Sequence, residues 1–583
     1  MPVNLRVLVN EDDALLYWRI KAPIQGCRGF AIQRRITRPG QAAVEDFLLN
    51  RTGFENQPLP PDPKGQGFSK PSTAWPFQRF SWTDHDANTG DAVQYRVIPM
   101  IRNKQGALEQ TEAEASAWSQ SRKLGVIPGA TFQPFFNRGF VISQFMARFL
   151  KEQNISAKEF KNKLNDQTEK QIRTFLSGDL RIALLDQLRI ADEENGEIYA
   201  ALFELSDPEL IAGLVKLGKR AHVVLANGSI TAKKGESAAD ARKRDENETA
   251  RKALTKAGVD VEITNRFLSP GPLGHNKFLV RTVKKGKDVV PQIAWTGSTN
   301  WAPTGLCTQV NNGLLINDAG IAKIYLDQWA RLRKAKSAFP PFLLDSNSQP
   351  KPVGAATPGS IRSTVWFTRT NKGVDMTALT AAVEKAKQGV LFLMFMPGGA
   401  GLFSTVAKLS GNSNLYVRGV VSELPNGRGD ESAVDVNLVD GPKHTPLHLD
   451  IIQPEGVKHG MAKFAGDVAE LSHKDFIGQV GHAIIHSKVV VVDPFSDDPT
   501  VITGSHNFST SASQKNDENF VIIQGDRQLA EAYAVNIEGA YAHYRFRAFL
   551  AQTDKPFNGL KDNDTWQAPK LAAATKELNF FGV

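Results

Sequence analysis

Hydrophobic and polar residues alternate along residues 1–122 at the period of two that is typical of β-strands. Turn-forming stretches, among them the proline-rich segment 58–63, separate the apolar runs. Such alternation places one face of each strand in a core and leaves the other in water. The pattern therefore predicts an all-β sandwich over residues 1–122, with strands at 5–9, 14–18, 30–34, 77–82 and 92–100.

Beyond residue 122, apolar runs alternate with segments of helical character, and the same order occurs twice. The first half is predicted to contain a strand at 197–205, a helix to about residue 217 and a strand at 221–226. Asp207 and Pro208 indicate where that helix begins, as an N-cap followed by proline in the first turn. The second half is predicted to contain a strand at 390–396, a helix at 402–409 and a strand at 415–421. Apolar strands alternating with helices predict an α/β fold with largely buried sheets.

The repeated order indicates an internal duplication, with one repeat at 123–345 and the other at 360–583. The stretch 340–359 is rich in proline and serine, which is the composition of a linker. A long insertion at about 425–478 interrupts the second repeat. The highly charged segment 231–256 is predicted to be a solvated helix face, and the last 30 or so residues show little periodicity.

The composition is that of an ordinary globular protein with a modest basic excess. Of its 583 residues, 41% are hydrophobic and 22% are charged, and the formal net charge is +9. This charge favours an anionic partner, such as nucleic acid or an anionic lipid surface. Cys27 and Cys307 fall in different predicted domains, which excludes a disulfide framework.

The beginning of the chain has neither a basic segment nor a long apolar segment of the kind found in signal peptides. The longest apolar run, 390–396, is far too short to span a membrane. We therefore expect a protein of the cytoplasm, or one secreted by a non-classical route, and any membrane contact is expected to be peripheral.

One short motif occurs in both halves and carries the candidate chemistry. Its first copy consists of His275, Asn276 and Lys277, followed by Gly297, Ser298, Thr299 and Asn300. Its second copy consists of His486, Ser487, Lys488 and Asp493, followed by Gly504, Ser505, His506, Asn507 and Glu518. Two copies of histidine and lysine, each followed by Gly-Ser-x-Asn, are hard to obtain by chance.

Each motif copy places its histidine and lysine two residues apart, so in a strand both side chains point to the same face. The serine and asparagine of each copy are expected to repeat this geometry on the next strand. If the halves pack about a pseudo-twofold axis, both sets converge on one site. One histidine can then attack phosphorus while the other protonates the leaving oxygen, and the lysines stabilise the phosphate charge. This set suits a phosphodiester and requires neither a metal nor another cofactor.

The two copies resemble the motif of the phospholipase D superfamily, His-x-Lys-x4-Asp followed by Gly-Ser-x-Asn. The resemblance implies a two-repeat fold of mixed sheets flanked by helices, with the halves related by a pseudo-twofold axis in a monomer. It also implies a phosphohistidine intermediate, with the first histidine as nucleophile and the second as acid. The candidate catalytic residues are His275, Lys277, Ser298, Asn300, His486, Lys488, Asp493, Ser505, Asn507 and Glu518.

The first copy departs from this pattern at two positions. Thr282 stands where the second copy has Asp493, and Asn311 stands where the second copy has Glu518. In the similar bacterial nucleases the glutamate orients the histidine, and the segment 515–519 resembles theirs, so we assign this role to Glu518. On this basis His275 is expected to lack both carboxylates, which weakens its predicted basicity.

The N-terminal segment resembles, more loosely, the end of a fibronectin type III or immunoglobulin-like sandwich. The resemblance rests on Trp82-Thr83-Asp84 and on the strand around Tyr95, which would be the corner tyrosine of such domains. It implies a spacer or binding domain whose partner is unknown.

Other interpretations of these residues are possible. The histidine pairs 482/486 and 444/448 have a spacing that could hold zinc on a helix, but a β-branched run and Pro446 disfavour helices there. The glycines at 398–401 resemble a phosphate loop but lack the following Gly-Lys-Ser/Thr. Trp301 and Phe508 are expected to be core residues rather than platforms for bases.

Three functions follow from the sequence. Phospholipase D-type hydrolysis of a phospholipid is favoured, because the simplest nucleases of the superfamily carry one motif and dimerise. Metal-independent cleavage of DNA or RNA is the alternative, favoured by the basic charge and the nuclease-like second copy. A binding protein that uses a degenerate site to hold phosphate is the third.

Overall fold

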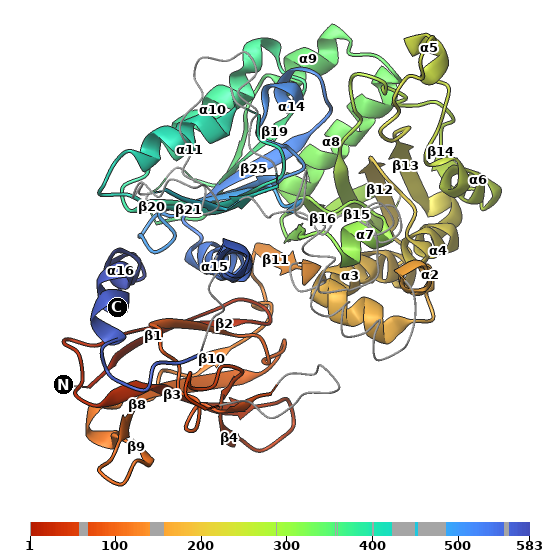
Figure 1. The fold of residues 1–583 in the computed structure, drawn as a ribbon. Helices are drawn as coiled ribbons and strands as arrows, with labels where there is room; N and C mark the ends of the chain where they lie inside the picture. The colour runs from red at the N-terminus through yellow and green to blue at the C-terminus, as the bar shows by residue number, and fades with distance from the viewer. Residues whose placement is uncertain are drawn as a thin grey trace. The chain divides into compact units, whose positions relative to one another are not determined.

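The computed structural model describes residues 2–57, 68–139, 157–286, 288–355, 357, 359–398, 401–422, 449–452, 485–552 and 559–583. They form two compact units (Figure 1). The first unit contains 1–126, 531–542 and 546–583, and the second contains 127–530 and 543–545. Within the described residues, no helix is both long and apolar enough to cross a lipid bilayer.

The first unit contains two antiparallel sheets, as the alternating pattern predicts. One sheet has the order β1 (Asn4–Val9), β2 (Ala14–Arg19) and β7 (Ser81–Asp84). The other has the order β10 (Arg122–Lys123), β8 (Ala92–Arg102), β3 (Cys27–Thr37) and β4 (Val44–Phe47), with β9 (Leu108–Gln110) paired to β8. The short strands β5 (Leu49–Asn50) and β6 (Lys70–Pro71) form a separate pair. Tyr95 is buried, and its hydroxyl donates to Asp84 at 2.7 Å.

The end of the chain belongs to the first unit, so the prediction that the second repeat continues to residue 583 is wrong. Trp566 packs against Phe30 and Phe80, with ring centroids 5.8 Å apart in both pairs. Phe581 stacks on Tyr17 at 4.0 Å. Between these contacts runs helix α16 (Gln567–Phe580). The segment shows little sequence periodicity because a few large rings, rather than a regular apolar stripe, attach it.

The second unit contains two mixed sheets with corresponding strand orders. The first sheet runs β11 (Phe132–Phe136), β17 (Asn312–Ile316), β16 (Asp288–Gly297), β15 (Lys277–Lys285), β12 (Glu197–Leu202), β13 (Ala221–Leu225), β14 (Asp260–Val261). The second runs β18 (Lys351–Val353), β19 (Arg362–Phe367), β25 (Asn519–Gln524), β24 (Thr500–Gly504), β23 (Val489–Val492), β20 (Gly389–Met394), β21 (Tyr416–Val421), β22 (Leu449–Ile452). The predicted fold class, mixed α/β sheets with antiparallel sheets before them, is confirmed.

Helices connect and flank these sheets (Figure 1). Those of the first half are α2 (Ala157–Asn165), α3 (Lys170–Glu193), α4 (Pro208–Leu217), α5 (Ala238–Ala241), α6 (Glu248–Lys256), α7 (Pro303–Cys307) and α8 (Ala319–Ala335). They are followed by α9 (Pro341–Asn347), α10 (Val374–Val383), α11 (Leu402–Ser410), α14 (Thr510–Gln514) and α15 (Arg527–Gln552). Helix α4 begins where predicted, because the Asp207 side chain accepts hydrogen bonds from the backbone of Glu209 and Leu210, both at 3.1 Å.

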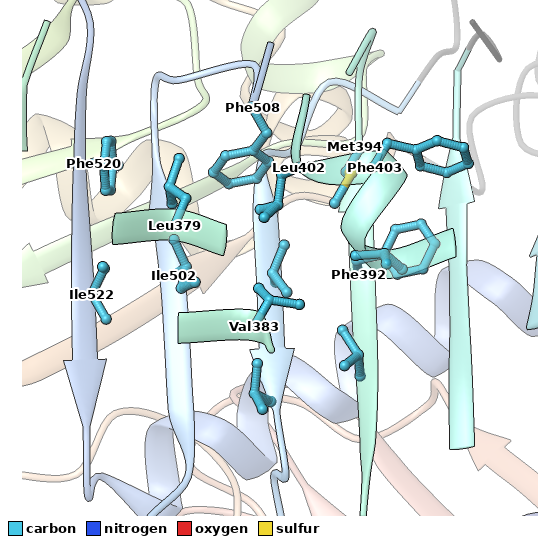
Figure 2. Packing of buried hydrophobic residues seen from close by; sticks show 14 of the residues in the cluster. Leu379, Val383, Phe392, Met394, Leu402, Phe403, Ile502, Phe508, Phe520 and Ile522 are labelled. Carbon is cyan, nitrogen blue, oxygen red and sulfur yellow. The ribbon is translucent and has the colours of Figure 1, made fainter. Parts of the chain in front are cut away.

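The core of the second half lies between its sheet and the two helices α10 and α11 (Figure 2). Phe392 and Met394 of β20 contribute to it, as do Leu402 and Phe403 of α11. Phe508, the residue after the second Gly-Ser-x-Asn, is fully buried in the same cluster, and Trp301 is fully buried in the first half. Their prediction as core residues is therefore confirmed.

The segment between the halves contains a helix and a strand among its described residues, which corrects its prediction as a linker. Pro341 opens α9, because proline suits the first turn of a helix, and β18 then pairs with β19 at the edge of the second sheet. Within the predicted insertion at 425–478, strand β22 extends the sheet in parallel to β21, and the rest lies outside the described residues.

Reciprocal contacts join the two halves within the second unit. The amide of Asn312 donates to the Thr503 hydroxyl at 2.8 Å, and the hydroxyl of Thr296, the counterpart of Thr503, donates to the Asn519 side-chain oxygen at 2.5 Å. Tyr325 of α8 packs between Phe278 of the first sheet and Phe367 of the second, at centroid distances of 5.1 and 5.3 Å. Because Asn312 and Asn519 are equivalent in the two halves, the contacts have the reciprocity of a pseudo-twofold arrangement.

Candidate active site

Both motif histidines lie just before a strand rather than within it. His275 precedes β15, which begins at Lys277, and His486 precedes β23, which begins at Val489. Each histidine is held by the backbone of the other half. The His275 N–H donates to the Asp517 carbonyl and the His486 N–H to the Val310 carbonyl, both at 2.9 Å. The two motif copies therefore meet, as expected, but as connecting segments fixed across the junction of the halves.

The histidine partners are exchanged between the halves. Nδ1 of His275 lies 2.7 Å from Oε2 of Glu518, and Nδ1 of His486 lies 2.9 Å from Oδ1 of Asn311. The prediction that His275 lacks a carboxylate is therefore wrong. The glutamate of the second copy serves the histidine of the first copy, and the histidine of the complete copy has the neutral partner.

Hydrogen bonds behind these partners fix their orientation. Ser505 donates to Oε2 of Glu518 at 2.8 Å, and Ser298 donates to Oδ1 of Asn311 at 2.7 Å. The amide nitrogen of Asn311 donates to the Gly305 carbonyl at 2.8 Å, so its oxygen must face His486. Both serines thus hold the histidine partners. Both imidazoles carry a proton on Nδ1 that points to oxygen, which leaves a lone pair on Nε2 for chemistry.

The glycines of the two Gly-Ser-x-Asn segments permit this close approach. A Cβ atom on Gly297 would lie 2.4 Å from the Asn312 carbonyl oxygen, and one on Gly504 would lie 2.3 Å from the Asn519 carbonyl oxygen. Both distances are far inside van der Waals contact, so only glycine fits beside the neighbouring strand.

The two lysines are buried beside the histidines and have matching surroundings. The Lys277 ammonium donates to the His275 carbonyl at 2.8 Å, and the Lys488 ammonium donates to the His486 carbonyl. Phe203 lies under Lys277 and against His275, and Phe395 does the same for Lys488 and His486. The ring centroids of both phenylalanine–histidine pairs are 4.8 Å apart. Sequence analysis missed both phenylalanines as site residues, although each directly follows a buried apolar strand, β12 or β20.

The two motif asparagines lie beyond the ends of β16 and β24 and differ in their contacts. The amide nitrogen of Asn300 donates to Oε2 of Glu204 at 2.9 Å. The buried Oδ1 atoms of Asn300 and Asn507 have no hydrogen-bond partner among the described residues. Glu204 is a further residue that sequence analysis missed, because no motif marks it.

Burial and like charges favour the neutral form of both imidazoles. Burial, only partly opposed by Glu518, lowers the pKa of His275 to about 4. Burial, with the nearby Lys488, Lys277 and His275, also lowers the pKa of His486 well below its usual value. Electrostatic interaction therefore links the two motif copies. Although burial opposes ionisation of Glu518, His275 and Lys277 hold the pKa of its carboxyl below the ordinary value.

The pKa values of the two lysines are also lowered, by burial and, for Lys488, by a neighbouring positive charge. Burial lowers the pKa of Lys277 to about 7, although Glu518 and Glu204 oppose the change. Burial, with the charge of Lys277, lowers the pKa of Lys488 well below its usual value. An entering anion would favour the charged form of both lysines and of both imidazoles. The site is therefore arranged to receive negative charge.

Asp493, the aspartate of the complete motif copy, lies at the other end of β23 from Lys488. Its carboxylate accepts hydrogen bonds of 2.7 to 3.1 Å from the backbone N–H groups of Lys387, Gln388 and Gly389. In the first half Thr282 takes this place and donates to the Glu197 carbonyl at 3.2 Å. The structure thus places Asp493 in a turn that supports the sheet, away from the histidines.

The residues considered for zinc, His444, His448 and His482, lie outside the described residues, as do 399 and 400 of the glycine-rich loop. In the part of the chain that the structure describes, no group of three or more histidine, cysteine, aspartate or glutamate side chains could hold a metal ion.

Comparison with protein families agrees with this arrangement. Residues 432–540 match the family described as cardiolipin synthase, PLD-like domain. This range contains the second motif copy and Glu518. The match thus covers part of the second half of the chain and does not extend to the first motif copy.

Curated relatives match a shorter segment. Proteins named phospholipase D from Rickettsia prowazekii (strain Madrid E) and Rickettsia felis (strain ATCC VR-1525 / URRWXCal2) are each 47% identical to this chain over 53 residues. The segment is 9% of this chain and 23% and 24% of those proteins. The chain thus matches about a quarter of the length of these relatives.

Solved structures match this chain at low similarity. Phosphatidylserine synthase from Haemophilus influenzae Rd KW20 has a TM-score of 0.37 and 11% identity, over 70% of this chain and 92% of that one. The phospholipase D family member Nuc from Salmonella typhimurium has a TM-score of 0.19 and 17% identity, over 32% of this chain and 96% of that one. At these TM-scores the likenesses carry no argument about function.

Proposed function

We propose that this protein is a phosphodiesterase that forms a phosphohistidine on His275, and that its substrate is a phospholipid. The observation that carries the proposal is the pairing of two buried histidines with different partners, a carboxylate on His275 and an amide on His486. A carboxylate stabilises the imidazolium that forms when a histidine becomes a nucleophile. An amide fixes the ring without this charge, which suits a histidine that must give up a proton.

In the first step, Nε2 of His275 attacks phosphorus, and a P–N bond forms as the P–O bond to the leaving group breaks. His486 has gained a proton in response to the phosphate anion, and it gives this proton to the leaving oxygen, which departs as an alcohol. Lys277 and Lys488 stabilise the charge on the non-bridging oxygens, with Asn507 beside them.

In the second step, His486 takes a proton from water, and the water oxygen attacks phosphorus. The P–N bond breaks, which returns His275 and releases a phosphomonoester. The products are thus an alcohol and a phosphomonoester, and the two lysines supply the positive charge that a metal supplies in other enzymes. Because both motif copies lie in one compact unit, we propose that a monomer is sufficient.

Phospholipid is the proposed substrate class because the matching family is described as cardiolipin synthase and the curated relatives are named phospholipase D. The presence of both motif copies on one chain also supports it. Nucleic acid is the second candidate, favoured by the net charge of +9 and by the nuclease-like segment 515–519.

The substrate test compares hydrolysis of phospholipid vesicles, single- and double-stranded DNA, and RNA by the purified protein, with EDTA present. We expect release of a head-group alcohol from the vesicles and an EDTA-resistant rate. Faster cleavage of a nucleic acid would replace the substrate proposal. Reversible loss of all activity in EDTA would contradict the metal-independent mechanism. Inactivity on every phosphodiester would favour the third function, a protein that binds phosphate without hydrolysing it.

The intermediate is tested with His486→Ala and an activated, labelled phosphodiester. A good leaving group needs no acid, but the second step still needs a base, so label is expected to accumulate on the peptide containing His275. Lys488→Ala is expected to lose about 10²-fold or more in turnover. Label on His486 in a His275→Ala protein would reverse the two roles.

A further inference from the structure

Glu204 has no counterpart in the second half, although its surroundings do. In the first sheet Leu202 pairs with Lys277, and in the second sheet the pairing of Leu393 with Val489 sets Met394 opposite Lys488. The next residues are the equivalent Phe203 and Phe395 described above. The residue after them is Glu204 in the first half and Met396 in the second.

This carboxylate engages a residue of the phosphate-binding motif. Its Oε2 accepts the amide nitrogen of Asn300 at 2.9 Å. In a carboxylate pair of this kind the amide must present its nitrogen, so the oxygen of Asn300 points elsewhere, and it is buried without a partner in the described structure. Asn300 therefore cannot offer that N–H to a phosphate oxygen until Glu204 releases it.

Three groups face Glu204, one from each element around it. Lys277 at the start of β15 attracts its negative charge, Glu246 before α6 repels it, and Asn300 donates to it. Burial, followed by Glu246, raises the pKa of Glu204 against the opposing effects of Lys277 and Asn300. The Glu204 carboxylate thus interacts with Lys277 and Asn300, the same groups that would bind an anionic substrate.

We propose that Glu204 is a positioning residue that holds Asn300 and screens Lys277 while the site is empty, and that it takes up a proton when a phosphate anion enters. The proton comes from solvent and converts the carboxylate to a neutral carboxylic acid. Asn300 and Lys277 are then free to bind the anion. The second half, with Met396 in this place, has no such exchange, so the two sides of the site respond differently to the same ligand.

The proposal rests on the proposed function only in requiring that the site binds a phosphate anion. It is tested by titrating the full-length protein with inorganic phosphate in a calorimeter, in two buffers of different ionisation enthalpy, from pH 6 to 9. The wild type is expected to take up as much as about one proton more per bound phosphate than Glu204→Gln. Glu204→Gln is also expected to bind phosphate about tenfold more tightly than the wild type at the alkaline end, where the wild-type carboxylate is charged.

A matched control is Glu246→Gln, which removes a neighbouring carboxylate that does not contact Asn300. Its Oε2 instead accepts the Ser229 backbone N–H at 2.7 Å. Glu246→Gln is expected to retain the additional proton uptake. If Glu204→Gln does not fold, Glu204→Met copies the second half and serves for the same measurement.

Equal proton uptake and equal phosphate affinity in wild type and the Glu204 variant at every pH would overturn the proposal. Loss of the uptake in Glu246→Gln with its retention in Glu204→Gln would also overturn it. Failure of the proposed function has a different signature, since a wild type that hydrolyses no phosphodiester could still bind phosphate with this proton exchange.

Discussion

Glu518 and Asn311 occupy equivalent positions in the two halves, but only one of them carries a charge. The carboxylate lies on His275 and the amide on His486, so the two imidazoles differ in basicity although their other neighbours match. At the level of single residues, this difference is the support for the proposal that the first motif copy supplies the nucleophile.

Glu518→Gln tests this assignment. Glutamine can still accept hydrogen bonds from His275 and Ser505, but it cannot stabilise an imidazolium by charge. We expect turnover to fall about 10²-fold or more, with little change in melting temperature, when steady-state rates are measured on bis(p-nitrophenyl) phosphate. Asn311→Asp is the matched variant and is expected to lose less. Retention of more than a tenth of the wild-type rate in Glu518→Gln would count against a role for the charge.

Lys277→Met tests the electrostatic strain at the site through thermal stability. The pKa of Lys277 is about 7 in the folded protein and 10.5 in a model compound, so between these pH values the unfolded chain binds more protons. The contribution of Lys277 to the free energy of unfolding therefore rises as the pH rises through this window. We expect the melting temperature of the wild type, relative to that of Lys277→Met, to increase by about 2–4 °C or more from pH 7 to 10. If this difference in melting temperature is constant or decreases with pH, the pKa of Lys277 is not lowered in the folded protein.

At the level of elements, the two ends of a strand have different roles, because one end carries a residue of the site and the other carries a residue that stabilises the fold. β23 has the lysine of the site before its first residue and Asp493 after its last. Asp493 adopts a φ of +49°, a left-handed conformation that aspartate and asparagine tolerate better than alanine. It accepts hydrogen bonds from three consecutive backbone N–H groups.

Asp493→Ala is therefore expected to reduce stability and to spare the reaction. Loss of a buried acceptor for backbone N–H groups costs about 1–3 kcal/mol. Urea unfolding measures this cost, and turnover on bis(p-nitrophenyl) phosphate is expected to stay within about twofold of the wild type. Asp493→Asn, which keeps an acceptor and tolerates the backbone, is expected to lose less stability. A large fall in the turnover of correctly folded Asp493→Ala would show that Asp493 contributes to the reaction as well as to stability.

In both halves the sequence predicted the central order of strand, helix and strand followed by the two motif strands, because β12, β13, β20 and β21 are largely apolar runs and a helix start such as that at Asp207 has a local signal. It did not predict the strands at the outer edges, such as β11 and β18, which are short or interrupted by polar residues and proline. It also predicted that the two motif copies would meet. It could not predict which half supplies the partner of each histidine, because equal spacing within a copy says nothing about contacts between copies. Glu204 was missed because its role depends on Asn300, far away in the sequence.

At the scale of the whole molecule, the first unit contains both ends of the chain. Trp566 is buried against Phe30 and Phe80, and its indole N–H donates to the Cys27 carbonyl at 3.1 Å. The β-sandwich therefore depends for part of its core on residues that lie more than 400 positions further along the chain.

Trp566→Ala is expected to destabilise the first unit by about 3–5 kcal/mol, the usual cost of removing a large buried ring. Limited proteolysis is expected to cleave the sandwich strands of the variant sooner than those of the wild type. Initial turnover on bis(p-nitrophenyl) phosphate is the control and is expected to remain. Unchanged protease resistance would show that the C-terminal segment contributes little to this unit.

The exchanged histidine partners have an evolutionary consequence. In a symmetric dimer of single-motif chains, a mutation next to one histidine appears next to both, so neither can specialise. Joining two copies in one polypeptide removes this restriction, and Glu518 and Asn311 show how the copies have since diverged. The price is mutual dependence, because neither half retains a histidine together with its own partner. The dependence is unequal: two copies of the second half could pair His486 with Glu518 of the other copy, whereas two copies of the first half would offer His275 only the amide of Asn311.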